Sequence, residues 1–204
     1  MGRYTGPRVK KMRALGVELP GLSRKSIAKR PHRPGEHGQA SQRPKDYKLR
    51  LLEKQKLRFN YGVSERQLRR IIREAIRSKT LTGDKIIELL ERRLDNVVFR
   101  GGLAPTIPAA RQLVNHNHIT VNNKRVNIAS YRVKVGDVIR PREKSLKLDP
   151  IQIALLDGPE LNHSEWLEFD ESTVSIRIMS LPNADSIPFP LELPLVIEYY
   201  SRLL

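Results

Sequence analysis

The sequence predicts an α+β fold, because its hydrophobic periodicity changes twice along the 204 residues. Apolar residues recur at helical spacing between residues 46 and 114, alternate with polar residues from residue 119 to residue 139, and return to helical spacing at residues 193–200. Helical spacing is typical of an amphipathic helix, and alternation is typical of a strand with one buried face. We therefore expect helices packed on a small twisted antiparallel sheet.

Lysine and arginine are concentrated in the first part of the chain. The sequence has 38 Lys and Arg against 22 Asp and Glu, a formal net charge of +16. Residues 1–80 contain 23 basic and 6 acidic residues and residues 85–147 contain 13 and 5, whereas residues 148–204 contain 2 and 10. A protein this basic needs a polyanion, usually a nucleic acid or an anionic membrane. This distribution favours an RNA-facing surface and an acidic back that faces solvent or protein neighbours.

Residues 1–45 are rich in Gly, Pro, Lys and Arg and have little periodic apolar signal. We expect an extended basic arm with little core of its own, which orders when its cations neutralise RNA phosphates. A disordered tail in the isolated protein is the alternative. The candidate ligands, including a tyrosine that can either stack on RNA or pack in a core, are Arg3, Tyr4, Arg8, Lys10, Lys11 and Arg13, followed by Arg24, Lys25, Lys29, Arg30 and Arg33.

From Asp46 the chain is predicted to be helical. Ser64 and Gln67 have the spacing of a capping box, and they open the clearest amphipathic helix of the chain. A solvated face is the simplest interpretation of charges on a helix, but it predicts mixed signs, and here two glutamates oppose five arginines. We therefore expect phosphate contacts from this segment. The candidates are Lys48, Arg50, Lys54, Lys56 and Arg58 on the first helix, and Arg66, Arg69, Arg70 and Arg73 on the second.

Residues 91–139 are the most informative stretch. Apolar spacing predicts a helix from residue 83 to residue 100, with Arg92 and Arg93 off its buried face. Thr106 can cap a second helix. The two helices would form one wall of a small core.

A β-hairpin is expected next, where the apolar period becomes two. Asn122 and Asn123 supply a tight turn that tolerates positive φ. Val126 and Ile128 then return as the second strand. The helices and the hairpin would form a rigid scaffold with a basic surface. The candidate RNA ligands on this surface are Arg92, Arg93, Arg111, Asn115, His116, His118, Lys124, Arg125 and Tyr131.

The last part of the chain is acidic, but it carries two further structural signals. Residues 166–178 alternate in a way that suggests strands extending the sheet. Residues 193–200 have one apolar side, which predicts a C-terminal helix that packs back on the N-terminal helices. Arg202, just beyond that helix, is a further candidate RNA ligand.

Five short stretches, RLDNVVFR, ARQLVNH, HITVN, ASY and GDVI, resemble the S-four RNA-binding module. Together with RYTGPRVKKMRALG and PGEHGQ they are most similar to the small-subunit ribosomal protein number four family, and with no cysteine present to the zinc-free branch. The resemblance implies that the module is inserted in a helical domain. The implied domains are an arm at 1–45, a helical domain at 46–90 completed by 186–204, and an RNA-binding domain at 91–185 with its core module at 91–142.

The resemblance also implies a function. Members of that family bind 16S-type small-subunit rRNA at a multi-helix junction of the 5′ domain, nucleate assembly of the subunit body and influence decoding accuracy. Implied partners are neighbouring small-subunit proteins numbers five and three, and mRNA at its entrance near Arg43 and Lys45. A strong messenger-unwinding role is not expected, because Ala40, Ser41 and Gln42 stand where the family is more basic. The sequence is most similar to plastid and cyanobacterial members of the family. This similarity implies a ribosome in the plastid stroma or the bacterial cytoplasm.

Catalysis is not expected, although modules of this kind also occur in RNA-modifying enzymes. Asp84, Asp95 and Asp137 each have a structural explanation, as helix-start, local-pairing and turn residues. The sequence has no Gly-rich phosphate loop and no nucleophile and base constellation, so we expect no cofactor, no metal and no small-molecule substrate. No apolar run approaches ~18 residues, so no segment is expected to span a membrane. The basic helix at Ser64 to Lys79 has no Trp or Phe to insert into lipid, so no membrane partner is expected. The remaining alternative is a free-standing RNA chaperone or translation regulator.

Overall fold

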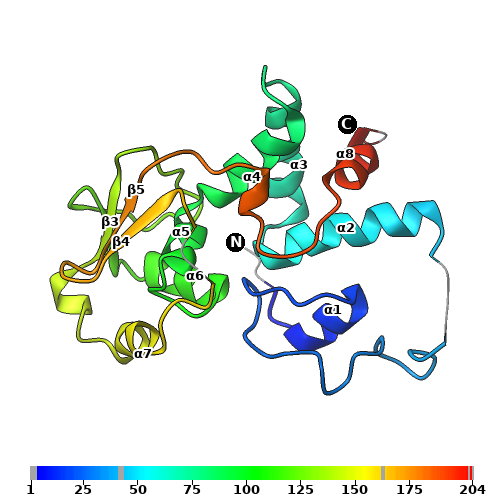
Figure 1. The fold of residues 1–204 in the computed structure, drawn as a ribbon, viewed down its shortest axis with the longest axis horizontal. Coiled ribbons are helices and arrows are strands. Elements are labelled where there is room, and N and C mark those ends of the chain that lie inside the picture. The colour runs from blue at the N-terminus through cyan, green and yellow to red at the C-terminus, as the bar shows by residue number, and fades with distance from the viewer. Residues whose placement is uncertain (1–3, 41–43, 162–163, 202, 204) are drawn as a thin grey trace. The chain divides into compact units, whose positions relative to one another are not determined.

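The computed structural model describes residues 4–40, 44–161, 164–201 and 203. The chain divides into two compact units (Figure 1). Residues 1–86 and 187–204 form one, the helical unit, and residues 87–186 form the other, the sheet unit. The predicted α+β fold class is confirmed. None of the helices in the described residues is both long and apolar enough to cross a membrane.

In the helical unit, helix α3 begins at the predicted capping box. The Ser64 side chain accepts a hydrogen bond from the backbone N–H of Gln67, and the Gln67 side chain accepts one from the backbone N–H of Ser64 at 3.0 Å. The helices of this unit are α1 (Arg8–Leu15), α2 (Asp46–Asn60), α3 (Glu65–Ile76), α4 (Thr82–Glu91), which continues into the sheet unit, and α8 (Leu193–Ser201). Leu68 and Ile72 are fully buried on the inner side of α3.

Helix α8 packs against α2 and α3, as predicted. The buried Tyr200 donates its hydroxyl hydrogen to Glu65 at 2.7 Å, and the buried ammonium group of Lys54 lies 2.7 Å from the same carboxylate. Two residues before Tyr200, Glu198 forms a 2.6 Å ion pair with Arg50 of α2. Polar contacts therefore hold the C-terminal helix on the N-terminal helices.

The N-terminal segment differs from the expected extended arm. Residues 8–15 form α1, and Met12 and Leu19 are fully buried. The buried backbone N–H of Gly21 donates to the Asn60 side chain at 3.0 Å. This small core could not be predicted from hydrophobic periodicity. Its few apolar residues are spread over turns and do not recur at the regular spacing of a long amphipathic helix.

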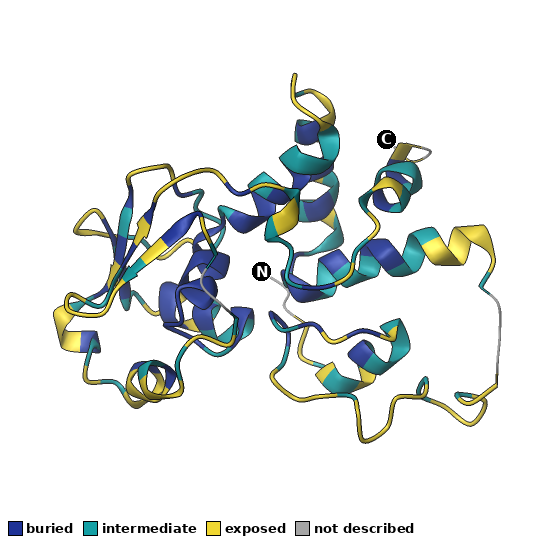
Figure 2. Cartoon of the chain, in the orientation of Figure 1, coloured by how far each residue is buried: buried dark blue, intermediate teal, exposed yellow. Residues whose placement is uncertain are grey.

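The sheet unit contains five antiparallel strands in the order β2-β1-β3-β5-β4. Figure 1 labels β3, β4 and β5 of this sheet. Its helices are α5 (Leu94–Arg100), α6 (Ile107–Asn115) and α7 (Asp149–Asp157), and its strands are β1 (Ile119–Val121), β2 (Lys124–Arg125), β3 (Val138–Pro141), β4 (Leu167–Asp170) and β5 (Ser175–Ile178). Short 3-10 turns lie at Glu143–Ser145 and Ala184–Ser186. Burial is greatest along α5, which is dark blue throughout in Figure 2. A Cβ atom at Gly101 would overlap the side chain of Ile176, so α5 and β5 approach each other closely.

Several local predictions for the sheet unit are confirmed. The Thr106 hydroxyl accepts a hydrogen bond from the backbone N–H of Ala109 and caps α6. The hairpin turns through Asn122 and Asn123, whose φ angles are 49° and 64°. Strands β4 and β5 extend the sheet beyond the hairpin.

The predicted continuous helix over residues 83–100 is wrong, because the chain breaks between α4 and α5. The backbone N–H of Leu94 donates to the carbonyl of Tyr131 at 2.8 Å, and that of Asp95 donates to the carbonyl of Ala129 at 3.1 Å. These hydrogen bonds to a segment distant in sequence replace the bonds that the two N–H groups would make inside a continuous helix. The spacing of apolar residues gives no sign of such long-range bonds.

Two other features differ from expectation. The returning strand β2 has two residues, and Ile128, predicted to be part of it, is 58% exposed. Helix α7 was not predicted, because its apolar residues are nearly contiguous and show little helical period.

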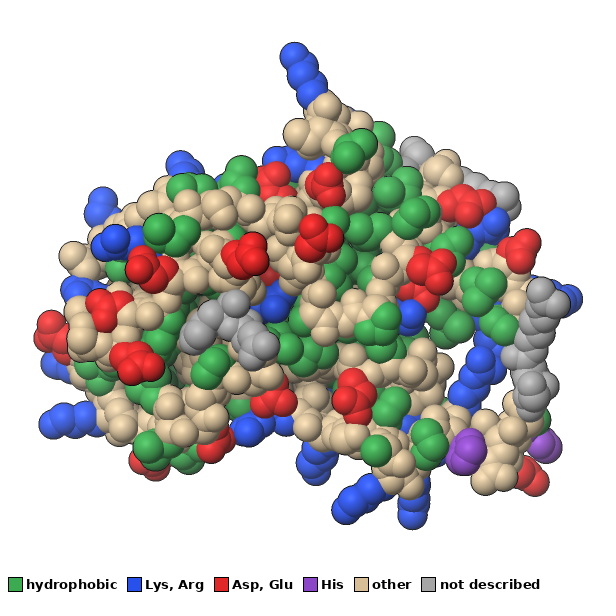
Figure 3. Space-filling view, in the orientation of Figure 1, with side chains coloured by type: hydrophobic (Ala, Val, Ile, Leu, Met, Phe, Trp, Pro, Cys, Tyr) green, Lys and Arg blue, Asp and Glu red, His purple; other side chains and the backbone are tan. Residues whose placement is uncertain are grey.

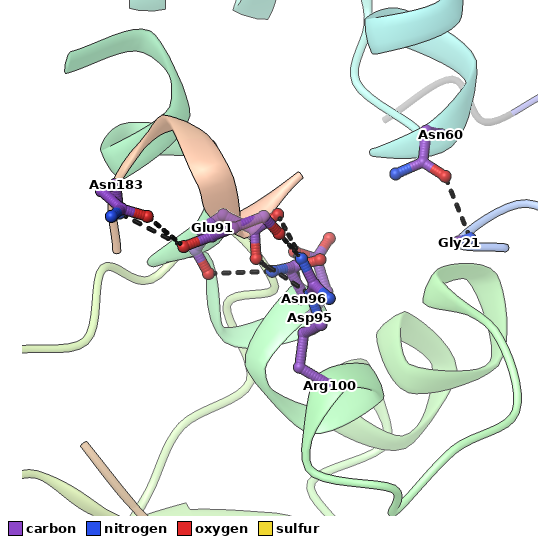
Figure 4. A network of polar contacts seen from close by, with 8 residues as sticks. Gly21, Asn60, Glu91, Asp95, Asn96, Arg100 and Asn183 are labelled. Atoms are coloured by element: carbon purple, nitrogen blue, oxygen red, sulfur yellow. Dashed lines mark hydrogen bonds and ion pairs between the residues drawn. The ribbon is translucent and has the colours of Figure 1, made fainter. Parts of the chain in front are cut away.

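A buried polar network lies where α4 meets α5 (Figure 4). The carboxylate of Glu91 has no exposed surface, and it accepts hydrogen bonds from Asn96 at 2.8 Å and from the Arg100 guanidinium at 3.1 and 3.2 Å. Arg100 also donates to the backbone carbonyl of Ser186. A buried ion pair of this kind is sensitive to loss of one partner, because the other charge remains in a low dielectric.

We predict that Glu91→Ala destabilises the sheet unit by about 3–5 kcal/mol, because it leaves the Arg100 guanidinium buried and uncompensated. The fluorescence of Trp166, which is 3% exposed and lies in this unit, reports its unfolding in urea. The exposed Glu171→Ala is the control and is expected to change stability by less than about 0.5 kcal/mol. Equal midpoints for the two variants would contradict the role of the network.

We also predict that acid loosens α8. Burial raises the pKa of Glu65, but hydrogen bonds from Lys54 and Tyr200 outweigh it, and the net shift is downward from 4.5. A lowered pKa in the folded state means that stability is present above pH 4.5 and is lost as the pH falls toward the folded value. Hydrogen exchange of the α8 amides, corrected for its intrinsic pH dependence, measures this loss.

In Tyr200→Phe the hydrogen bond to the Glu65 carboxylate is absent. We expect the protection of the α8 amides against hydrogen exchange to fall by about 1–2 kcal/mol at pH 7. Acidification should then reduce this protection further by less than it does in the native chain. An unchanged pH profile would show that this bond does not anchor α8.

Candidate nucleic-acid interface

Four arginines form a stripe on the exposed side of α3. They are Arg66, Arg70, Arg73 and Arg77, whose spacing of four, three and four residues places them on one side of the helix. All four are exposed, and among the described residues none has an ion-pair partner. The cationic stripe, as these four are called below, therefore has its donors available for phosphate. Arg77 was not among the predicted ligands, although its spacing from Arg73 could have indicated it.

Arg69 does not belong to the cationic stripe. It is half-buried, its guanidinium donates to the backbone carbonyl of Leu203 at 3.3 Å, and its Nε is buried. The sequence grouped it with its neighbours because only the position of the C-terminal segment decides its environment.

Three of the five predicted cations on α2 are used within the helical unit. Lys56 pairs with Glu53 at 2.5 Å, while Arg50 and Lys54 form the ion pairs near α8 described above. Arg58 is half-buried, with its guanidinium carbon 5.5 Å from the centre of the Phe59 ring. Lys48 is exposed, as is Lys45 just before the helix. Lys45 and Lys48 are therefore the most accessible of these candidates for phosphate contact.

The N-terminal candidates divide in the same way. Arg8 and Lys10 are exposed on α1. The Lys11 ammonium lies 5.6 Å from the ring centre of Tyr4 and 5.3 Å from that of Phe59. Tyr4 packs edge-on against Phe59 and donates to a backbone carbonyl, so part of this aromatic surface is already occupied.

Arg13 donates to the backbone carbonyl of His32 at 3.0 Å and thereby ties the following loop to α1. The loop carries five further cations, which are Arg24, Lys25, Lys29 and Arg30, all exposed, and the half-buried Arg33. The predicted ligands Arg3, Arg43 and Arg202 lie outside the described residues.

In the sheet unit the predicted exposure of Arg93 is wrong. Its side chain is 6% exposed and grips the fully buried carboxylate of Asp95 through two hydrogen bonds, of 3.0 and 2.7 Å. Arg111, from α6, donates to the same carboxylate at 2.6 Å. The structural role expected of Asp95 is therefore larger than a local pair, because it joins α5 to α6. Arg92 is mostly buried as well, with hydrogen bonds to the carbonyl of Val133 at 2.8 Å and to Glu88 at 2.6 Å.

The remaining predicted residues lie around α6 and the hairpin. Asn115, His116, Lys124 and Arg125 are exposed, and Tyr131 is half-buried. These residues can meet RNA without any change in the fold.

His118 differs from the exposed group. It is half-buried and lies 3.0 Å from the Ser145 hydroxyl. Burial lowers its pKa, and the nearby charges of His116 and Arg142 lower it further. The lowered pKa of His118 favours its neutral form at pH 7, which makes it a weaker candidate for phosphate contact than the exposed arginines and lysines.

Arg140 is an exposed cation that the sequence-based prediction omitted. In the sheet register, Thr120 lies opposite both Arg125 and Arg140. Register partners point to the same face of a sheet, so the two arginines flank Thr120 on the solvent-facing side. The alternation of Arg140 with buried Ile139 and Pro141 is the signal that could have indicated it.

No group of three or more His, Asp or Glu side chains in the described part of the chain could hold a metal ion. The exposed candidate side chains offer guanidinium, ammonium, imidazole and amide donors. Guanidinium groups grip phosphate oxygens and stack on bases, which suits a structured RNA.

Comparison with known proteins agrees with this chemistry. Residues 3–91 match the family described as Ribosomal protein S4/S9 N-terminal domain, and residues 92–139 match the S4 domain. The chain is 53% identical to the small ribosomal subunit protein uS4 of Methylobacillus flagellatus, over the whole of both chains. It is 50% identical to uS4 of Thermosynechococcus vestitus, with 99% of each chain covered, and 47% identical to uS4c of Cyanophora paradoxa, with 99% and 100% covered.

These relatives include bacterial and plastid proteins, and the identities do not set the plastid and cyanobacterial members apart from other bacteria. Two family matches that together span most of the chain, and relatives of full length, agree with each other. The chain belongs to the uS4 family, whose members are constituents of the small ribosomal subunit and not enzymes.

Proposed function

We propose that this chain binds directly to the 5′ domain of 16S-type rRNA, at a junction of several helices, and nucleates assembly of the subunit body. The observation that carries the proposal is the cationic stripe on α3, four exposed arginines without ion-pair partners among the described residues. Phosphate contacts supply much of the affinity of such proteins, and the rigid shape that carries the cations supplies specificity for folded RNA. The chain acts in the ribosome, in a bacterial cytoplasm or a plastid.

The two units would contribute different contacts. The helical unit offers the cationic stripe with Arg8 and Lys10, and the sheet unit offers Lys124, Arg125 and the residues around α6. Aromatic residues are 5% of the sequence and Tyr4 is already packed, so base stacking would be a minor part. Recognition would thus depend on the spacing of RNA backbones.

Contacts with neighbouring small-subunit proteins numbers five and three, and through them an influence on decoding accuracy, belong to the same proposal. Lys45 is exposed and would lie near the path of mRNA. The support is the family membership, together with a surface that keeps this cation accessible.

The test is binding of the full chain to a 5′-domain rRNA fragment and to an unrelated structured RNA of equal length, across a salt series. A preference for the 5′-domain fragment that persists at high salt is the expected result. Equal binding to both RNAs that is lost as salt rises would contradict recognition of a junction and would favour a general RNA chaperone.

Removing three charges of the cationic stripe should reduce the salt dependence of binding. For the triple variant Arg66→Gln, Arg70→Gln and Arg73→Gln we expect the slope of log K against log salt to fall by about two to three, since each lost phosphate contact removes about 0.7–0.9. Arg69→Gln is a matched control on the same helix, because Arg69 is half-buried and bonded to the chain itself. A slope that is equal in the triple variant and the native chain would exclude the stripe as a contact.

Substitutions of His118 and Lys124 should have different effects on the salt dependence of RNA binding. Because its pKa is lowered, His118 is neutral at pH 7, so His118→Gln is expected to leave the salt slope unchanged. Lys124→Gln is expected to lower it by about one, since Lys124 is an exposed cation. A reduced slope for His118→Gln at pH 7 would show that the imidazole is charged on RNA.

A further inference from the structure

The segment from residue 148 to residue 176 has a charge unlike that of the rest of the chain. It contains seven Asp and Glu and neither Lys nor Arg, in a chain of net charge +16. It includes α7 and β4, both in the sheet unit. A polyanion repels such a surface, so this side of the unit is unsuited to RNA.

Helix α7, within this segment, exposes apolar side chains. Leu156 is 85% exposed and Ile153 is 56% exposed. They are three residues apart and therefore neighbours on the helix surface. Ile151 and Ala154 are buried and attach the other side of α7 to its unit. Adjoining exposed apolar residues with a polar rim are typical of protein interaction sites.

Carboxylates form the rim of this apolar pair. Asp149 lies at the start of α7, Asp157 lies at its end, and Glu160 follows, all three exposed. In the place where Figure 1 labels α7, Figure 3 shows hydrophobic side chains with Asp and Glu side chains beside them. RNA and an anionic lipid surface would both be repelled here, whereas a basic protein segment matches the rim and can cover the apolar pair.

We infer that the α7 surface, formed by Asp149, Ile153, Leu156 and Asp157, is a docking site for a basic segment of a neighbouring protein. The occupant carries Lys or Arg on both sides of one or two apolar side chains. Leu156 and Ile153 supply the apolar anchor, and the carboxylates select the cationic partner. The inference rests on the proposed function, because the partner is a neighbour in the small subunit.

Photocrosslinking tests this directly. The full chain is made with p-benzoylphenylalanine in place of Leu156, assembled into small subunits and irradiated, and the crosslinked partner is sequenced by mass spectrometry. The matched control has the same group in place of Ile128, an aliphatic residue of the same unit that is 58% exposed but close in sequence to Lys124 and Arg125. We expect position 156 to crosslink to a Lys- and Arg-rich protein segment and position 128 not to reach that segment.

A second variant tests the apolar anchor. Ile153→Asp in the chain that carries the probe keeps the acidic rim but removes half of the apolar pair. We expect the crosslink yield to fall about tenfold or more, as the loss of a buried aliphatic contact implies. An undiminished yield would contradict docking on this face.

Sedimentation of the irradiated subunits distinguishes a failure of the docking inference from a failure of the proposed function. If the chain sediments with the subunits but position 156 crosslinks to rRNA, to a second copy, to its own chain or to no protein, the docking inference is overturned and the proposed function stands. If the chain does not enter subunits at all, the proposed function is overturned, and the inference with it.

Discussion

Two buried carboxylates, Glu91 and Asp95, are the constraint on which the sheet unit depends. Each has no exposed surface; Glu91 is bonded to the Arg100 guanidinium, and Asp95 is bonded to those of Arg93 and Arg111. Removing either carboxylate would leave guanidinium groups uncompensated in a low dielectric, and removing Arg100 would do the same to Glu91. These charges hold the break between α4 and α5 and fix α6 against α5. The exposed cations around α6 are thereby mounted on a rigid base.

Local signals predicted much of the fold, and long-range contacts determined what the sequence did not reveal. The Ser64 capping box, the Thr106 cap and the asparagine hairpin turn are short-range patterns with one physical solution each. The break before Leu94 depends on hydrogen bonds to residues 129–131, which spacing within a helix cannot indicate. Among the candidate ligands, charge alone could not distinguish the buried Arg93 from an exposed arginine.

The charges of the chain therefore have three separate uses. Buried guanidinium groups such as Arg93 and Arg100 stabilise the fold, while exposed ones such as those of the cationic stripe remain available to a polyanion. The acidic segment that includes α7 has seven carboxylates and neither Lys nor Arg between residues 148 and 176, and its inferred use is the docking of a basic protein segment. A net charge of +16 thus understates how unevenly charge is distributed along the chain, since residues 148–204 are acidic and residues 1–80 and 85–147 are basic. This uneven distribution suits the proposed function, in which the chain contacts both rRNA and protein neighbours.

The distinction between the buried, structural arginines and the exposed arginines of the cationic stripe can be measured in one experiment. Phenylglyoxal labels accessible guanidinium groups, and mass spectrometry reads each site in the free chain and in its complex with the 5′-domain rRNA fragment. The account predicts that Arg66, Arg70, Arg73 and Arg77 react in the free chain and are protected on RNA, while Arg93 and Arg100 remain unreactive in both states. Labelling of Arg93 and Arg100 in the folded free chain, or a cationic stripe equally reactive with and without RNA, would contradict it.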